Sequence, residues 1–106
     1  MENILSKQEI DQFKKDGAIF LKGKFDINWI KKLEIGIEKD IKNPSPRFKS
    51  HTLKKGVPAY LEDYWTWDLV PEFNDFVFNS PYARIAAELM SAKKINLVMD
   101  NWFLRE

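Results

Sequence analysis

Residues 27–41, INWIKKLEIGIEKDI, carry the strongest periodic pattern in the chain. Apolar side chains recur there at three- and four-residue intervals, which places them on one face of a helix over four turns. These side chains are Ile27, Ile30, Leu33, Ile37 and Ile41. The opposite face, which we expect to be solvated, carries Lys31, Lys32, Glu38, Lys39, Asp40 and Lys42. Asp26 is a suitable N-cap, and Pro44 and Pro46 stop the helix because a residue before proline avoids the α conformation.

The segment before this helix predicts a shorter helix followed by a strand. Ser6 and Glu9 have the spacing of a capping box, and Gly17 is a natural left-handed stop for a helix that begins after Ser6. The apolar run from Ala18 to Leu21 is too short for another helix. We therefore expect a strand there that is covered on both faces.

The pattern is weaker between Arg47 and Trp67. No period dominates in this stretch, and Gly56, Pro58 and several aromatic residues indicate an ordered loop that packs against the rest of the protein. The aromatic residues are Tyr60, Tyr64, Trp65 and Trp67.

Two helices and a last strand are predicted beyond that loop. Pro71 opens a short helix, and Ser80 followed by Pro81 is a cap with proline at the first helical position. Ile95 to Leu104 is rich in strand-favouring residues with apolar side chains on both faces, so it predicts a strand that is buried on both sides. The sequence supplies no evident partner strand for its outer edge.

The composition bounds both the architecture and the partners. A length of 106 residues suits a single domain, 1–106, and an apolar content of 44% is too high for a disordered chain. The order of elements predicts an α+β fold with helices packed on a small β-sheet. The net charge of +1 argues against a nucleic acid or an anionic membrane as a partner. With no membrane span or signal peptide visible, we expect a cytoplasmic protein.

Candidate catalytic side chains are few. The chain has no Cys and a single His, which excludes thiolate chemistry and every site that needs two imidazoles. His51 lies in a basic stretch and is better explained as a solvated or packing side chain than as a base, because no partner can be identified. Asp63 and Asp68 flank Trp65 and Trp67 and could form an acid/base pair, although the chain has sixteen carboxylates and such neighbours are common.

The aromatic residues between 60 and 67 have a second interpretation. They could stack on bases or sugars, with Lys54 and Lys55 near phosphates. The intervening acidic residues would repel a polyanion, so packing against the core or a partner is favoured.

Two stretches resemble the N-terminal part of the phytanoyl-CoA dioxygenase family of Fe(II)- and 2-oxoglutarate-dependent oxygenases. The first is a Leu-Ser-x-x-x-Ile-x-x-Phe-x-x-Asp-Gly pattern, and the second is a Ser-Pro-x-Ala-x-Ile-Ala-x-x-Leu helix ahead of a strand. The first is matched by Leu5, Ser6, Ile10, Phe13, Asp16 and Gly17, and the second by Ser80, Pro81, Ala83, Ile85, Ala86 and Leu89. The joint order of elements, over essentially the whole chain, carries the resemblance.

The resemblance implies the N-terminal part of a double-stranded β-helix, or jelly-roll, oxygenase. Such enzymes hold Fe(II) with a His-x-Asp/Glu pair and a distant His, and use 2-oxoglutarate as cosubstrate. With His51 as its one imidazole, this chain cannot supply that triad, so we expect no catalytic residue, no metal ligand and no bound cofactor in these 106 residues alone. Both metal motifs would follow the counterpart of Arg105, so the resemblance implies that the chain is an incomplete oxygenase domain. The resemblance also implies that Arg105 lies near the 2-oxoglutarate site, the alternative being a solvated side chain.

The main alternative is a self-contained α+β interaction module without catalysis. In either case the strand from Ile95 to Leu104 has an unpaired edge, and an unpaired edge favours association with another strand. We therefore expect a homo-oligomer that forms through this strand.

Overall fold

The computed structural model describes residues 3–51 and 60–105, which form four helices and a three-stranded antiparallel sheet. This confirms the predicted α+β class. In chain order the elements are α1 (Lys7–Asp16), α2 (Ile27–Lys42), β1 (Lys49–Ser50), β2 (Tyr60–Tyr64), α3 (Pro71–Asn79), α4 (Tyr82–Leu89) and β3 (Asn101–Arg105). Within these residues, no helix has the length and hydrophobicity needed to cross a membrane.

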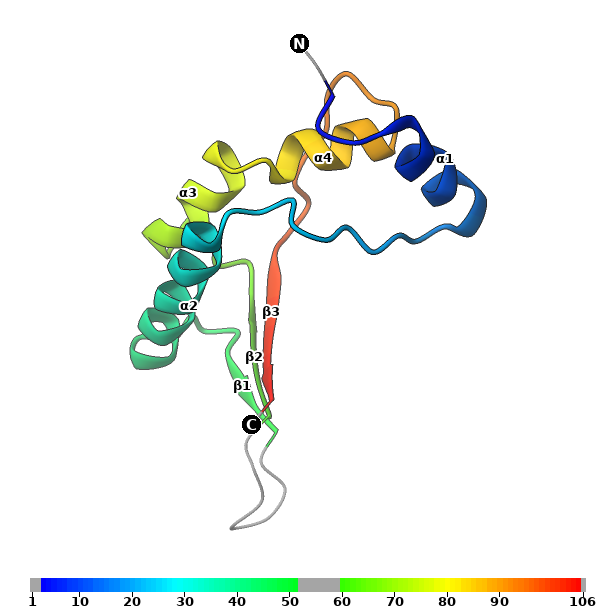
Figure 1. Cartoon of the computed structure of the whole chain (residues 1–106). Helices are drawn as coiled ribbons and strands as arrows, with labels where there is room; N and C mark the ends of the chain where they lie inside the picture. Colours follow the sequence, from blue (N-terminus) through cyan, green and yellow to red (C-terminus); the bar gives the residue numbers. More distant parts are fainter. Residues whose placement is uncertain (1–2, 52–59, 106) are drawn as a thin grey trace.

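The sheet has the order β1-β2-β3, so β2 is its central strand. Leu61 lies opposite Leu104, and Asp63 lies opposite Trp102, in the antiparallel register of β2 and β3. Figure 1 shows α2 and α3 beside the sheet, whereas α1 and α4 lie together at the other end of the molecule. The sheet is therefore covered by only one pair of helices.

The core lies where α2 and α3 meet the sheet. Val70, Phe73 and Trp102 are buried there. Partly buried apolar side chains surround them, namely Leu33, Ile37, Ile41, Phe48, Leu61, Trp67 and Leu104. A Cβ atom at Gly36 would stand 2.6 Å from Cε1 of Phe73, so a glycine at this position is what allows α2 to approach α3 so closely.

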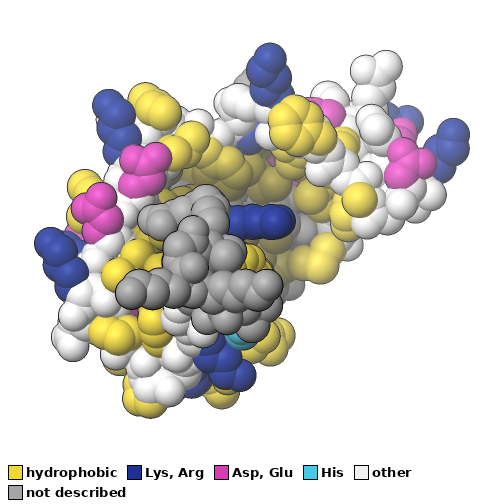
Figure 2. All heavy atoms as spheres, turned by 90° about the horizontal axis from the view of Figure 1, so that it is seen from below, with side chains coloured by type: hydrophobic (Ala, Val, Ile, Leu, Met, Phe, Trp, Pro, Cys, Tyr) yellow, Lys and Arg dark blue, Asp and Glu magenta, His cyan; other side chains and the backbone are white. Residues whose placement is uncertain are grey.

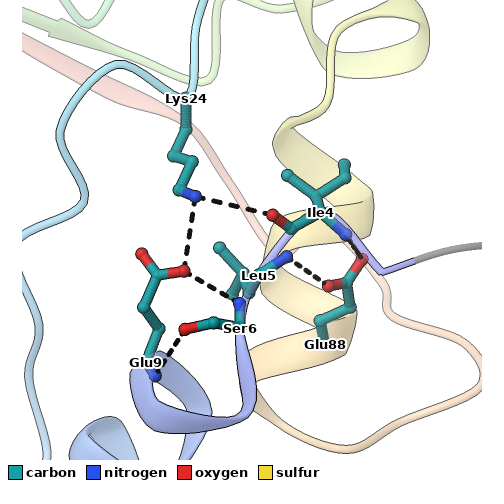
Figure 3. Close-up of polar contacts among 6 residues, drawn as sticks. All are labelled: Ile4, Leu5, Ser6, Glu9, Lys24 and Glu88. Atoms are coloured by element: carbon teal, nitrogen blue, oxygen red, sulfur yellow. Dashed lines mark hydrogen bonds and ion pairs between the residues drawn. The ribbon is translucent and has the colours of Figure 1, made fainter.

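Helix α1 is held against α4 by polar contacts over a long sequence separation (Figure 3). The predicted capping box is confirmed, with the Ser6 hydroxyl accepting from the Glu9 amide and the Glu9 carboxylate from the Ser6 amide. The Glu88 carboxylate accepts hydrogen bonds from the amides of Ile4, at 3.1 Å, and Leu5, at 2.9 Å. Lys24 lies 3.3 Å from the Glu9 carboxylate, so the segment after α1 joins the same network.

The strand expected at residues 18–21 is absent. These residues belong to an extended segment that crosses from α1 to α2 without a strand partner, and Phe20 is 85% exposed. A strand needs a neighbour for its backbone hydrogen bonds, and the apolar run alone could not show that none lies alongside.

The loop expected from Arg47 to Trp67 contains strands instead. Residues 49–50 and 60–64 pair as β1 and β2, and the backbone N–H of His51 donates to the carbonyl oxygen of Tyr60 at 2.7 Å. Gly56 and Pro58, on which the loop prediction rested, lie outside the described residues. The prediction was therefore wrong for residues 60–64, which form the centre of the sheet.

The last strand is shorter and more exposed than expected. β3 begins at Asn101, and residues 95–100 are extended without strand pairing. Trp102 is buried, but Val98 is 85% exposed and Phe103 is 57% exposed. The strand pairs with β2 along one edge and is one of the two edge strands of the sheet, β1 being the other. Burial on both faces was therefore a wrong prediction, because the described residues cover only one face.

The overall shape is elongated. The radius of gyration is 16.1 Å, whereas a compact chain of this length has about 13 Å. The apolar stripe of α2 is accordingly covered only in part. Leu33, Ile37 and Ile41 contact the core, whereas Ile27 and Ile30 remain exposed.

Candidate functional site

The residue carried over from the family resemblance, Arg105, lies exposed at the last position of β3, opposite Tyr60. His51 follows β1, and its Nε2 atom lies 3.6 Å from Oε1 of Glu62. Its ring also approaches that of Tyr60, with 5.4 Å between the ring centres. These residues occupy the end of the sheet near the C-terminus, and their side chains are accessible to solvent.

The aromatic residues between 60 and 67 do not form a single stacking surface. Tyr60 stacks on Phe103 with 5.9 Å between ring centres, and Trp67 meets Phe78 edge to face. The Arg47 guanidinium lies 5.9 Å from the Trp65 ring and donates to the carbonyl oxygen of Trp65. Contacts within the protein thus account for most of the aromatic residues between 60 and 67. Lys54 and Lys55, the proposed phosphate ligands, lie outside the described residues.

Asp63 and Asp68 do not form a pair. Asp68 is exposed on the turn after β2, whereas the Asp63 side chain points into the protein and is fully buried. The true neighbour of Asp63 is Asp40 of α2, which is 2% exposed. The expectation that Asp40 belongs to a solvated helix face was therefore wrong. It lies three residues after Ile37 and next to Ile41, on the edge of the stripe that faces the sheet.

Asp63 is held by three donors from the chain around it. Its Oδ1 atom accepts from the Ser45 hydroxyl at 2.5 Å and from the Tyr64 amide at 2.8 Å, and its Oδ2 atom accepts from the Ser45 amide at 3.2 Å. Burial alone would raise the pKa of Asp63, but hydrogen bonds from Asp40, Ser45 and Tyr64 outweigh it and lower that pKa.

Asp40 has the opposite electrostatic environment. Its Oδ2 atom accepts one hydrogen bond, from the Trp102 indole at 3.1 Å. Burial, the hydrogen bond with Asp63 and the charge of Asp63 raise the pKa of Asp40 from 3.8 to about 7. Two carboxylates that share a hydrogen bond need one proton between them, and these shifts put that proton on Asp40.

A third carboxylate, Asp100, orders the turn that follows β2. It accepts hydrogen bonds from the Thr66 amide, the Thr66 hydroxyl and the Trp67 amide at 2.8–3.2 Å. Its carbonyl oxygen accepts from the Trp65 amide at 2.9 Å. Trp65 has a φ of 59°, which is strained for a residue with a side chain, so these bonds stabilise an otherwise unfavourable backbone.

An apolar hollow of about 590 Å³ lies between α3, α4 and residues 95–99. A second hollow of about 300 Å³ reaches from the same segment towards α2. The residues that line both are Val77, Tyr82, Leu97 and Met99. In Figure 2 apolar side chains gather around the recess between the two ends of the molecule. We call this open region, with its two hollows, the apolar groove.

The arrangement therefore offers two distinct features. One is a buried pair of carboxyl groups in which burial and the neighbouring Asp63 raise the pKa of Asp40 to about 7, and the other is an exposed apolar groove. Within residues 3–51 and 60–105, no group of three or more His, Cys, Asp or Glu side chains is placed to hold a metal ion. The pair was missed in the sequence because its members lie 23 positions apart in an α-helix and a strand, and the one available signal was a carboxylate beside an apolar stripe.

Comparisons of the chain with protein-family models, with curated proteins and with solved structures found no match.

Proposed function

We propose that this chain is the N-terminal region of an Fe(II)- and 2-oxoglutarate-dependent oxygenase of the phytanoyl-CoA dioxygenase type. In this proposal the helices and the sheet form the outer part of a jelly-roll barrel, and further strands carry the iron and the hydroxylation chemistry. The observation that supports it most is the open apolar groove, part of which is lined by Asn101 and Trp102 of the edge strand β3. Exposed apolar surface next to a strand with one unpaired edge is where more protein packs.

The residues of this chain do not fit an iron centre by themselves. A facial triad needs two imidazoles and a carboxylate. The chain contains one His, at position 51, whose Nε2 atom lies 3.6 Å from Oε1 of Glu62. The proposal therefore gives this chain a structural share in the enzyme and assigns it no catalytic step.

Arg105 is the residue that the proposal connects to 2-oxoglutarate. Its guanidinium is exposed, and a guanidinium can bind a carboxylate through two parallel hydrogen bonds. In the protein made from the complete reading frame, Arg105→Ala should raise the half-saturating 2-oxoglutarate concentration roughly tenfold or more. Lys93→Ala, which removes an exposed charge from a turn outside the sheet, is the matched control and should leave that concentration unchanged.

The decisive experiment begins with the reading frame after codon 106. We expect it to encode a His-x-Asp/Glu motif and a later His, and its product should decarboxylate 2-oxoglutarate with added Fe(II). The 106-residue chain should bind no Fe(II) at submicromolar affinity. A stop codon directly after codon 106, or tight iron binding by the 106-residue chain, would contradict the proposal.

The alternative is a self-contained interaction module. The observations that favour it are the exposed side chains of Phe103 in the edge strand β3 and of Val98 shortly before that strand. Both proposals predict that the isolated chain covers this surface with a second copy. Burying roughly 300 Å² of apolar surface at about 25 cal/mol per Å² contributes roughly 7 kcal/mol before the cost of association. The reading frame separates the two, because only the module ends there.

Self-association through residues 95–104 can be measured directly. At high micromolar concentration, light scattering should give at least twice the monomer mass of 12.6 kDa. Phe103→Glu should shift the protein towards the monomer, because a charge cannot be buried cheaply in an apolar contact. Phe20→Glu changes an apolar side chain that is even more exposed but belongs to the segment between α1 and α2, and should leave the mass unchanged. A strictly monomeric wild-type chain would refute this prediction.

A further inference from the structure

Two carboxyl groups, rather than an ion pair, form the polar contact between helix α2 and the sheet. Asp40 comes from α2 and Asp63 from β2, and both are almost completely removed from solvent. The ion pairs between described residues leave both of them out. Two adjacent negative charges without a cation are strongly unfavourable in a buried site, so the contact persists only while a proton lies between them.

The hydrogen bonds decide which group holds the proton. Asp63 accepts from the Ser45 amide, the Ser45 hydroxyl and the Tyr64 amide, and each of these donors favours its ionised form. Among the side-chain hydrogen bonds of the described residues, Asp40 accepts only from the Trp102 indole. The protonated Asp40 thus donates to the ionised Asp63, and one junction connects α2, the turn at Ser45, β2 and β3.

We propose that Asp40 and Asp63 form a proton-dependent latch that holds helix α2 on the sheet while they share one proton and loosens when that proton leaves. This inference is independent of the proposed oxygenase role and of the fate of the apolar groove. Because Leu33 and Ile37 of α2 pack on the core, loosening the latch weakens the contact between α2 and the core as well.

The other charged groups near the latch do not replace the proton. The charged side chains on the segments around the carboxyl pair include Lys39, Lys42, Arg47, Glu72 and Asp100, and both lysines line the same groove as Asp40. Within the described residues, Lys42 makes no ion pair with either carboxyl group. Lys39 is paired with Glu72 at 2.6 Å, and the Arg47 guanidinium donates to the carbonyl oxygens of Tyr64 and Trp65. Asp100 adds a negative charge that also favours protonation of Asp40. A groove at the end of α2, lined by Asp40, Ser45 and Val70 among others, provides a path for the proton to solvent.

The direction of the pH dependence follows from the two states of the protein. In the unfolded chain Asp40 loses its proton near its ordinary pKa of 3.8, whereas the folded protein keeps it to about pH 7. Between these values the folded state binds the extra proton, so its stability falls as the pH rises. The folding equilibrium constant falls by up to about tenfold per pH unit. The fall ends above the pKa that Asp40 has in the folded protein. The pKa of Asp63 is lowered, so its contribution to folding stability is lost only at acidic pH and is constant across this window.

The test is urea denaturation of three proteins between about pH 5.5 and about pH 7.5. For the wild type the folding equilibrium constant should fall by roughly tenfold or more across this range. Asp40→Asn should abolish the dependence, because an amide can donate to Asp63 and accept from Trp102 at every pH. Asp68→Asn removes an exposed carboxylate and should retain the wild-type dependence. A wild type without this dependence, or Asp40→Asn with all of it, would overturn the latch.

A direct measurement covers the case in which Asp40→Asn does not fold. In wild-type protein labelled at the aspartate carboxyl carbons, one resonance should titrate near pH 7 and be assigned to Asp40. Trp102→Phe removes the indole donor that favours the ionised form, so this resonance should then titrate at still higher pH. If every aspartate resonance titrated below about pH 5, close to ordinary values, the latch would be excluded.

Discussion

Replacing Phe73 with alanine should lower the free energy of unfolding by about 3–5 kcal/mol, the range found for buried aromatic residues. Phe73 is 7% exposed, belongs to the buried cluster with Val70 and Trp102, and packs against the backbone of α2 at Gly36. Its removal leaves a cavity between α2 and α3 that neither helix can fill without moving. Urea denaturation followed by tryptophan fluorescence measures the loss.

The same experiment needs a control for the removal of an exposed phenylalanine. Phe20→Ala deletes the same atoms from a side chain that is 85% exposed, and we expect a change within about 0.5 kcal/mol. Because Phe73→Ala can remove most of the stability of a domain this size, Phe73→Leu should show a smaller loss of the same sign. A loss below about 1 kcal/mol for Phe73→Ala would mean that this cluster is not the stabilising core.

Replacing Asp63 with alanine should cost about 3 kcal/mol or more. The substitution leaves the Ser45 amide, the Ser45 hydroxyl and the Tyr64 amide without their acceptor, and each orphaned buried group costs about 1–3 kcal/mol. Asp63→Asn should not restore the stability, because an amide has one acceptor oxygen where the carboxylate has two.

The asymmetry between the two carboxyl groups makes this prediction specific. Asp40→Asn should be tolerated much better than Asp63→Asn, since an amide reproduces the hydrogen bonds of a protonated carboxyl but not those of an ionised one. Asp68→Ala serves as the surface control and should change the stability within about 0.5 kcal/mol. Equal losses for Asp40→Asn and Asp63→Asn in urea denaturation at neutral pH would contradict the assignment of the charge to Asp63.

Local patterns in the sequence predicted the helices well. The capping box of Ser6 and Glu9, the left-handed Gly17 and the stripe of Leu33, Ile37 and Ile41 all involve residues within a few positions of one another. Such features depend on short-range geometry, which the sequence displays directly. The bounds of α1 and α2 accordingly agree with the prediction.

The strands were harder to predict because a strand depends on its neighbours. Residues 18–21 have strand-favouring side chains but no partner, whereas β2 has a partner on each edge although two of its five residues are acidic. In β2 the inward positions are Leu61 and Asp63, and a carboxylate at an inward position conceals the alternation expected of a half-buried strand. The tertiary contacts that make Asp63 suitable there come from Ser45 and Asp40.

The candidate functional residues show the same limit. The sequence drew attention to His51 and Asp68, which are conspicuous by type or spacing, and the structure leaves both in exposed positions. Asp40 was assigned to the solvent because charged residues usually are. Its burial depends on a hydrogen bond to Trp102, and no local pattern connects two residues so far apart.

The separation of these partners also constrains how the chain can fold while it is being synthesised. Asp40 and Trp102 are 62 positions apart, and the amide of Ile4 is 84 positions from its acceptor on Glu88. The hydrogen bonds within α1 and α2 are local, but the contact of α1 with Glu88 and the junction between α2 and β3 must wait for residues synthesised much later. Until then the emerging polypeptide displays uncovered aromatic and aliphatic side chains, which is the condition under which nascent proteins engage chaperones.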